Sequence, residues 1–336
     1  MLSTHPPGMT QHVRSAQVVQ ELASALGPGP WTVGQVLAAG WSRGQLRSAV
    51  TAGRLVRPHK GAVDLPSGAG STAATARAAL LTLSRRAALS HSTAGTEQRL
   101  WLPRRPDPHE HVTAPGDADD LRNTVRIHGC SLPEEWVTVR NGVRMTSPAR
   151  TAVDLARGAS LPDALIVLDS FLRLCIGDDP SDPALARGDE LRREARRRGV
   201  PLLEAAYLGE FGWPGTVVVR DGIPLADAGS ESPLESWSRG VMIKEALPRP
   251  VIGAHVQGAS GAWYWVDFLW AGAGVIGEAD GIGKYGTTDD DVRQAMTAER
   301  RRQADLEAAG YVVIRWTWSE PTGQWLRRLR RALGRA

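Results

Sequence analysis

The sequence predicts a multidomain α+β protein, and two observations carry that prediction. Its 336 residues exceed what one hydrophobic core usually organises. Two runs rich in proline, glycine and serine, at 65–70 and 227–233, have the composition of linkers. We therefore predict a helical N-terminal domain over 1–66, a mixed α/β middle domain with its linker over 67–230, and a further domain over 231–336.

The N-terminal domain has the pattern of a winged helix-turn-helix. A first helix is expected over 17–26, Thr32 caps a second, and Ser42 caps a third that ends at Gly53. Residues 54–65 then alternate as the two strands of a wing do. In this domain type the second helix of the turn lies in the major groove with its first residues against base edges.

Charge supports a nucleic-acid partner for this domain. The first 66 residues hold six Lys/Arg and two Asp/Glu, a net +4 that equals the formal excess of the whole chain. Such a concentration is typical of proteins that bind polyanions, although a solvated basic face or a winged helix that only contacts protein has the same pattern. The predicted DNA contacts are polar and basic side chains, namely Ser42, Arg43, Gln45, Arg47, Arg57 and Lys60.

Two stretches resemble a known family. Residues 40–61 read GWSRGQLRSAVTAGRLVRPHKG, and residues 140–156 read RNGVRMTSPARTAVDLA. The first is similar to the N-terminal DNA-binding domain, and the second to the following domain, of AbiEi antitoxins from type IV toxin–antitoxin (abortive infection) systems. The resemblance covers about half the chain and implies repression of its own operon, with the operon promoter and a cognate toxin as partners. The wing departs from the family by ending without its usual aromatic residue.

Two motifs of the middle domain favour structure over chemistry. Residues 146–151 have the pattern of a helix start, with Pro148 at the first position and Arg150 in a local ion pair. His109 and His111 would share one face of a strand. Two imidazoles with no third ligand following them do not indicate a metal site.

The C-terminal domain is predicted to have the element order α-β-β-β-α-β-α. The expected helices and strands, in chain order, are 233–246, 251–256, 263–270, 275–281, 290–309, 311–318 and a helix from 322. Asp267 and Glu278 lie in adjacent antiparallel strands joined by a tight turn, so both carboxylates can reach one ion. Acids inside apolar strands are costly unless something compensates them, and a divalent cation with oxygen ligands does so.

These motifs resemble the PD-(D/E)xK restriction-endonuclease-like superfamily, and more narrowly a small bacterial domain related to very-short-patch-repair endonucleases. The matching pieces are ESPLES (231–236), WVDFLW (265–270), GEADG (277–281) and ERRRQADLEAAGYVVIRWTW (299–318). The resemblance implies a metal-dependent hydrolase in which Mg²⁺ or Mn²⁺ activates a water for attack on phosphorus.

Site residues follow from this resemblance. The implied catalytic set is Glu235, Asp267, Glu278, Asp280 and Lys284, with Asp267 and Glu278 as metal ligands and Glu235 as accessory acid. Arg301 and Arg302, on the following helix, are the expected nucleic-acid contacts.

Two departures keep the function open. Asp280 stands where the superfamily has lysine, and no histidine follows His255, where the repair enzymes use them. Hydrolysis of DNA or RNA is one reading. The other is a non-catalytic autorepressor whose last domain only binds nucleic acid or a partner.

Composition limits the remaining classes. The two cysteines, Cys130 and Cys175, exclude a disulfide framework and a thiolate zinc site. No apolar stretch approaches the roughly 18 residues of a membrane span, and the first 14 residues lack a signal-peptide core, so a cytoplasmic protein without a membrane partner is expected. No organic cofactor is expected, and the sequence does not indicate an oligomeric state.

Overall fold

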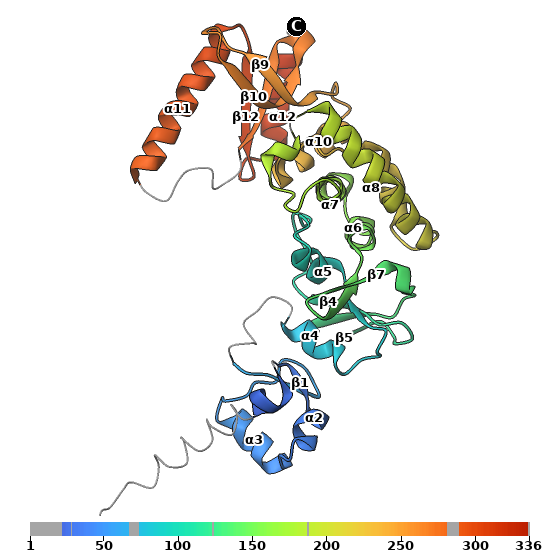
Figure 1. The fold of residues 1–336 in the computed structure, drawn as a ribbon. Coiled ribbons are helices and arrows are strands. Elements are labelled where there is room, and N and C mark those ends of the chain that lie inside the picture. Colours follow the sequence, from blue (N-terminus) through green and yellow to red (C-terminus); the bar gives the residue numbers. More distant parts are fainter. Residues whose placement is uncertain are drawn as a thin grey trace, which may run out of the picture. The chain divides into compact units, whose positions relative to one another are not determined.

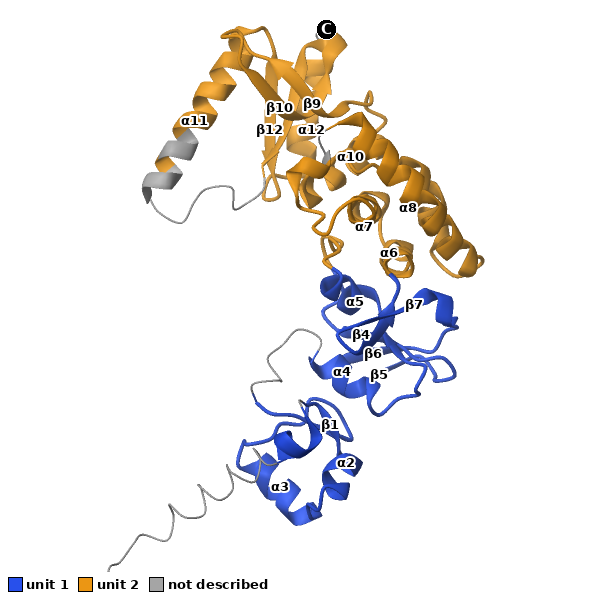
Figure 2. Ribbon diagram, in the orientation of Figure 1, with its two compact units in different colours: residues 1–98, 106–147 blue, residues 99–105, 148–336 orange. Residues whose placement is uncertain are grey.

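The computed structural model describes residues 22–27, 29–66, 74–122, 124–186, 188–280 and 289–334. They form a mixed α+β structure with three β-sheets, which confirms the predicted class (Figure 1). The chain divides into two compact units, shown in Figure 2. Unit 1 holds residues 1–98 and 106–147, and unit 2 holds residues 99–105 and 148–336. The division into three domains remains a prediction.

The N-terminal part of unit 1 contains the capped helices that the sequence predicts. Its elements are β1 (Trp31–Thr32), α2 (Val33–Ala38), α3 (Arg43–Thr51) and β2 (Ala62–Val63). Thr32 and Ser42 are the N-caps of α2 and α3, each in a capping box with a glutamine three residues later. Strand β2 pairs antiparallel with β1, and a single bridge, Val56 to Asp64, joins the two sides of the predicted wing. The predicted first helix is helical over 22–26, and its earlier residues lie outside the described ones.

A six-stranded sheet forms the rest of unit 1, in the order β5-β6-β4-β3-β8-β7. Its strands are β3 (Ala88–Leu89), β4 (Glu110–Thr113), β5 (Asp120–Arg122), β6 (Val125–His128), β7 (Val137–Arg140) and β8 (Val143–Thr146). The accompanying helices are α4 (Ala74–Leu80), α5 (His91–Glu97) and the short η1 (Glu134–Trp136). Strand β4 lies between β6, to which it is parallel, and β3, to which it is antiparallel.

Unit 2 begins with helices. They are α6 (Pro148–Arg157), α7 (Leu161–Leu174), η2 (Pro183–Ala186), α8 (Asp189–Gly209), α9 (Thr216–Gly222) and η3 (Ile223–Leu225). Helix α6 begins at Pro148 as predicted, and Arg150 pairs locally with Asp154 at 3.1 Å. Helix α7 is buried along almost its whole length, and the later helix α10 packs against it.

The rest of unit 2 has the predicted order of elements. They are α10 (Pro233–Lys244), β9 (Val251–Gln257), β10 (Trp263–Trp270), η4 (Ala271–Ala273), β11 (Val275–Asp280), α11 (Asp289–Ala308), β12 (Val312–Thr317) and α12 (Thr322–Leu333). The sheet order is β12-β11-β10-β9, with β11 parallel to β12 and antiparallel to β10. None of the helices in the described ranges is both long and apolar enough to cross a membrane.

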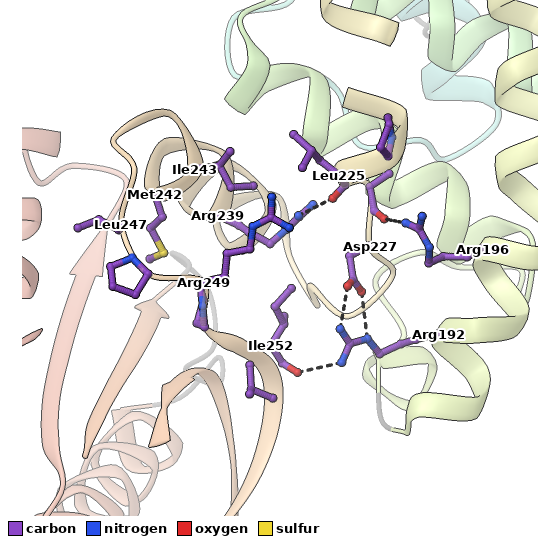
Figure 3. A pocket seen from close by; sticks show the side chains of 15 residues that line it. Arg192, Arg196, Leu225, Asp227, Arg239, Met242, Ile243, Leu247, Arg249 and Ile252 are labelled. Atoms are coloured by element: carbon purple, nitrogen blue, oxygen red, sulfur yellow. Dashed lines mark hydrogen bonds and ion pairs between the residues drawn. The ribbon is translucent and has the colours of Figure 1, made fainter. Parts of the chain in front are cut away.

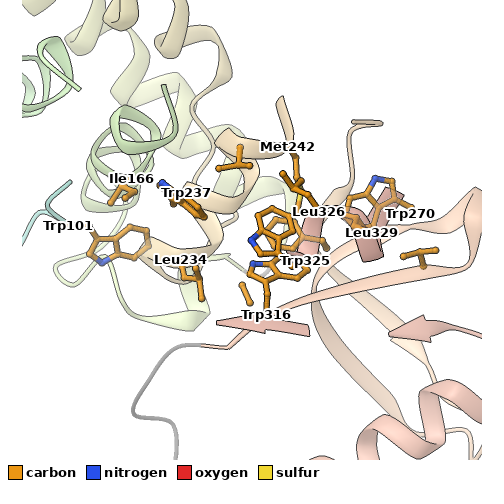
Figure 4. Packing of buried hydrophobic residues seen from close by; sticks show 14 residues of the cluster. Trp101, Ile166, Leu234, Trp237, Met242, Trp270, Trp316, Trp325, Leu326 and Leu329 are labelled. Carbon is orange, nitrogen blue, oxygen red and sulfur yellow. The ribbon is translucent and has the colours of Figure 1, made fainter. Parts of the chain in front are cut away.

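Tryptophans form the centre of this unit (Figure 4). The ring of Trp316 stacks on Trp325 with 4.7 Å between centroids, and on Phe268 at 5.7 Å. The indole N–H of Trp316 donates to Ser238 Oγ of α10 at 2.8 Å, so its polar edge is satisfied in the core. Strands β10, β11 and β12 and helices α10 and α12 all contribute to this cluster. It therefore fixes β10, which carries Asp267, and β11, which carries Glu278 and Asp280.

Candidate acid cluster and nucleic-acid interface

Three of the predicted acids influence one another electrostatically in unit 2. Phe268 pairs with Gly277 in the ladder between β10 and β11, so Asp267 and Glu278 follow at the next opposed positions. Helix α10 contributes Glu235, which is only 2% exposed. Burial, and then the charge of Asp267, raise the pKa of Glu235 well above its ordinary value. The same two causes raise the pKa of Glu278.

Asp267 is held at the end of the β10–β11 ladder. One of its carboxylate oxygens accepts the backbone N–H of Ala279 at 2.6 Å. The side chain therefore satisfies an amide of the neighbouring strand, which fixes the carboxylate beside Glu278.

Glu278 is paired with an arginine rather than standing alone. Arg302 of α11 donates to Glu278 Oε1 at 2.7 Å, to Glu299 Oε1 at 2.9 Å and to the Trp265 carbonyl at 2.6 Å. Glu278 is 4% exposed, and burial together with the charge of Asp267 raises its pKa to about 8 despite the arginine. Arg302, predicted to contact nucleic acid, thus has its guanidinium turned toward the acids, whereas Arg301 beside it is exposed.

Asp280 has an arginine partner as well. Both of its carboxylate oxygens accept from Arg315 of β12, each at 2.8 Å. Arg315 also pairs with Glu299, so Glu299 links the two arginines. Lys284, the remaining residue of the predicted catalytic set, lies outside the described residues.

Glu235 serves as part of a helix cap. Its carboxylate accepts the Glu231 N–H and the Ser232 hydroxyl, both at 2.7 Å. Ser232 Oγ in turn accepts the Glu235 N–H at 3.3 Å, so Ser232 is the N-cap of α10. The raised pKa of Glu235 means that it holds a proton over a wider pH range than an exposed glutamate.

Five acids and two arginines come together in this part of unit 2. This acid cluster consists of Glu235, Asp267, Glu278, Asp280 and Glu299 with the guanidiniums of Arg302 and Arg315. The two guanidiniums pair with Glu278, Asp280 and Glu299. Among the described residues, however, the one set of three or more metal-ligating side chains whose ligand atoms all lie within 4.8 Å of one another consists of histidines in unit 1.

The predicted DNA contacts lie at the start of α3. Arg43 and Arg47 are exposed, while Leu46 and Ala49 point into the core, so the helix is amphipathic in the way a groove-binding helix requires. Gln45 is partly committed to the capping box, because its Oε1 accepts the Ser42 N–H at 2.8 Å. The basic residues predicted for the wing, Arg57 and Lys60, are both exposed between Val56 and β2.

A cavity of about 410 Å³ in unit 2 was not predicted from the sequence (Figure 3). Arginines hold its walls together: Arg192 donates twice to Asp227, at 2.7 and 3.0 Å, and once to the Ile252 carbonyl at 3.2 Å. Arg239 bonds the Leu225 carbonyl at 2.6 Å. None of the predicted acids lines this cavity. Helix α10, which carries Glu235, contributes other residues to one of its walls.

Part of the chain is similar to known proteins. Residues 43–205 match the family described as AbiEi antitoxin C-terminal domain. Two uncharacterized proteins of Mycobacterium tuberculosis, MT2308 (strain CDC 1551 / Oshkosh) and Rv2248 (strain ATCC 25618 / H37Rv), are each 30% identical over 210 residues. The match covers 58% of this chain and 68% of each relative, and the chain belongs to the family of these two proteins. The crystal structure of the RV2827C protein from Mycobacterium tuberculosis is similar at 17% identity and a TM-score of 0.36, over 63% of this chain and 82% of that one.

Proposed function

We propose that this protein is a DNA-binding regulator of the AbiEi antitoxin type, which represses its own operon through a winged helix-turn-helix. The observation that carries the proposal is the capped start of α3, where Arg43 and Arg47 are exposed above a buried apolar face. The AbiEi match begins at this helix. The promoter of its own operon and a cognate toxin are the partners that this function implies.

The chemistry of α3 suits recognition of DNA. Arginine pairs bidentately with guanine edges in the major groove, each good pair contributing about 1–3 kcal/mol of discrimination. Arg57 and Lys60, exposed near the same helix along the chain, are suited to phosphates. Because each neutralised phosphate releases counterions, binding should weaken with salt by a slope of about 0.9 per phosphate contact.

The test is retention of a labelled fragment from upstream of the gene, against a random fragment of equal length. We expect the double variant Arg43→Ala/Arg47→Ala to bind the upstream fragment at least about tenfold more weakly and to lose its preference over the random fragment. Arg193→Ala is the matched control, because Arg193 is an exposed helical arginine of unit 2 that pairs with Glu190. Unchanged retention by the double variant would overturn the proposal.

A second candidate function, metal-dependent hydrolysis of phosphodiesters by a restriction-endonuclease-like domain, is favoured by the gathering of Glu235, Asp267 and Glu278, since the charge of Asp267 acts on both glutamates. Asp267 and Glu278 would hold Mg²⁺ or Mn²⁺, and the ion would supply an activated water. The fit is incomplete, because Arg302 already supplies a positive charge to Glu278 and a cation would have to displace it.

Plasmid nicking separates the two candidates. Supercoiled DNA is incubated with the full chain in Mg²⁺, in Mn²⁺ and in chelator, beside Asp267→Asn and the control Asp305→Asn. Asp305 lies in the same unit and bonds Ser260 outside the acid cluster. Nicking that requires metal and disappears only in Asp267→Asn would establish hydrolysis. If the protein retains DNA but nicks it under none of these conditions, the regulator is the one of the two candidate functions that stands.

A further inference from the structure

Three histidines come together in unit 1 from three separate elements. His91 begins α5 directly after β3, His111 lies on β4, and His128 ends β6. Strand β4 is the middle of the three neighbours β6-β4-β3, which brings the three rings to one region of the sheet. One ligand atom from each histidine lies within 4.8 Å of those of the other two.

The rings are arranged close together and nearly parallel. His111 Nδ1 is 2.9 Å from His128 Nε2, with 9° between the two ring planes. The centroid of His91 is 4.0 Å from that of His128 and 5.2 Å from that of His111. Three imidazoles so placed bring several ring nitrogens into one small volume.

We propose that His91, His111 and His128 form a binding site for a transition-metal ion, for which Zn²⁺ is the best chemical match. Neutral imidazole is a preferred ligand of Zn²⁺, and three protein ligands leave a fourth coordination position for water or an exogenous group. This site is independent of the acid cluster and of the proposed DNA contacts, since it uses none of their residues.

Burial suits ligation. His111 is 4% exposed, while His91 and His128 are half-buried, so the cluster is partly enclosed and still reaches solvent at the latter two rings.

A carboxylate lies behind the proposed ligand His111. Its Nε2 is buried without a hydrogen-bond partner among the described residues and is 3.9 Å from Asp107 Oδ2. A ligating histidine usually turns its second nitrogen toward a carboxylate, which fixes the tautomer and strengthens the ligand. Asp107 is itself fixed by Arg126 at 2.9 Å and by the His109 N–H at 3.0 Å.

The backbone around His91 holds its ring beside the sheet. His91 has a φ of +49°, in the left-handed region that non-glycine residues rarely enter. The preceding Ser90 donates its N–H to the His111 carbonyl at 3.0 Å, and Ser90 Oγ is 3.1 Å from His91 Nδ1. This unfavourable conformation is thus maintained where it serves the histidine cluster, as backbone strain at functional sites often is.

A hydrogen bond between two neutral imidazoles is the competing explanation of the 2.9 Å separation between His111 and His128. Nitrogens that share a tetrahedral zinc ion at about 2.0–2.1 Å lie roughly 3.3 Å apart, so the two rings must separate by a few tenths of an ångström on binding. The two explanations differ in whether the protein takes up metal.

The experiment measures zinc uptake by the full chain. Protein stripped with chelator is dialysed against Zn²⁺, its metal content is measured, and Co²⁺ is substituted to record the ligand-field spectrum of a tetrahedral nitrogen site. We expect one ion per chain and a raised Tm in zinc. His91→Gln and His128→Gln should each lose most of the bound zinc, and Asp107→Asn should weaken it about 10–100-fold.

His255→Gln is the matched control, because His255 stacks on Trp265 in unit 2 and belongs to no ligand group. It and Asp267→Asn should retain the full zinc content, which separates this site from the acid cluster. Retention of upstream DNA by His91→Gln shows that the variant is folded and keeps the two proposals apart. Absence of zinc from the wild-type chain, or zinc retained by both histidine variants, would overturn the metal site.

Discussion

The acid cluster of unit 2 and the histidine cluster of unit 1 both collect metal-ligating side chains from separate elements, but they balance charge differently. In the acid cluster, Arg302 and Arg315 already supply positive charge to Glu278 and Asp280. In the histidine cluster, the ring of His111 is neutral, and the nearby Arg126 is paired with Asp107 instead. A metal ion that binds in the acid cluster must displace a guanidinium or a proton from a carboxylate. A metal ion that binds in the histidine cluster displaces no guanidinium and no added proton from His111.

Proximity of metal-ligating residues does not by itself define a metal site. Buried carboxylates need compensation, and an arginine in the fold provides it permanently. Neutral imidazoles are tolerated without a counter-charge, so their gathering is not explained by charge balance. The acid cluster is consequently stable as a salt-bridge network, and the histidine cluster is the more open to an added ion.

The largest expected effect is that of removing Arg302. Arg302→Ala would leave Glu278 buried beside Asp267 without its ion pair, a change that typically costs about 3–5 kcal/mol. Urea denaturation at pH 9 measures it, above the pKa of about 8 at which Glu278 loses its proton. Because Glu278 is protonated below that value, the loss should shrink as the pH is lowered toward 7. Arg301→Ala, at the exposed neighbouring position, should change the free energy of unfolding by less than about 0.5 kcal/mol.

Adding Mg²⁺ to the Arg302→Ala variant tests whether the acid cluster can bind a cation in place of the guanidinium. If Mg²⁺ restores the stability of Arg302→Ala, the acids form a cation site that the arginine competes for. If Mg²⁺ does not restore the stability of the destabilised variant, the guanidinium is a structural counter-ion. The acid cluster would then differ from the histidine cluster in not binding an added cation.

The second effect is on the pH dependence of stability. The pKa of Glu278 is about 8 in the folded chain against an ordinary value near 4.5, so the folded state binds more protons between these two values. Stability contributed by this group therefore falls as the pH rises from about 4.5 to 8 and is constant above that. Glu278→Gln should remove this decline and be the more stable form at pH 8 and above, by a few kcal/mol at most.

Denaturation midpoints measured from pH 5 to 9 check this prediction, with Glu245→Gln as a control. Glu245 is an exposed glutamate of the same unit, paired with Arg330. A parallel decline in wild type and Glu278→Gln would show that another group, such as Glu235, carries the pH dependence.

A smaller effect is expected from the cap beneath the acid cluster. Ser232→Ala removes the hydroxyl that bonds Glu235 and caps α10, a loss of about 0.5–2 kcal/mol. We expect a value toward the upper end, because Glu235 is buried and, within the described part of the chain, would keep only the Glu231 N–H as donor. Ser232→Thr, which keeps the hydroxyl, should recover most of the stability in the same urea titration. Equal stability of all three chains would mean that the cap contributes nothing.

The sequence predicts the placement of the acids better than their environment. Strand alternation and the short turn place Asp267 opposite Glu278, and the capped helix contributes Glu235, because both depend on local spacing. The inward turn of Arg302 depends on packing against β10, and its spacing on α11 looks like that of a solvated face. The finer nuclease fold and the catalytic roles remain predictions.

The histidine cluster illustrates what spacing cannot predict. His109 and His111 are close in sequence, yet the partners of His111 are His128 from the end of β6 and His91 from the start of α5. Strand β3 has only two residues and β5 only three, too short for an alternating pattern to be recognised. Long-range parallel pairing of β4 with β6 brings His128 to His111, and no local motif encodes it.

The smallest expected effect concerns the exposed cap of α3, which contrasts with the buried cap of α10. Ser42→Ala removes the acceptor for the Gln45 N–H, and since both residues are exposed, water can replace it. We expect a loss of about 0.5–1 kcal/mol in urea denaturation, less than for Ser232→Ala.

Ser42→Asp is the control, because aspartate restores the cap but adds a negative charge beside Arg43. If α3 binds DNA, Ser42→Asp should keep stability and lose affinity for the upstream fragment, with a shallower salt dependence. Equal affinity of wild type and Ser42→Asp would place the start of α3 away from the phosphates and leave DNA binding to Arg57 and Lys60.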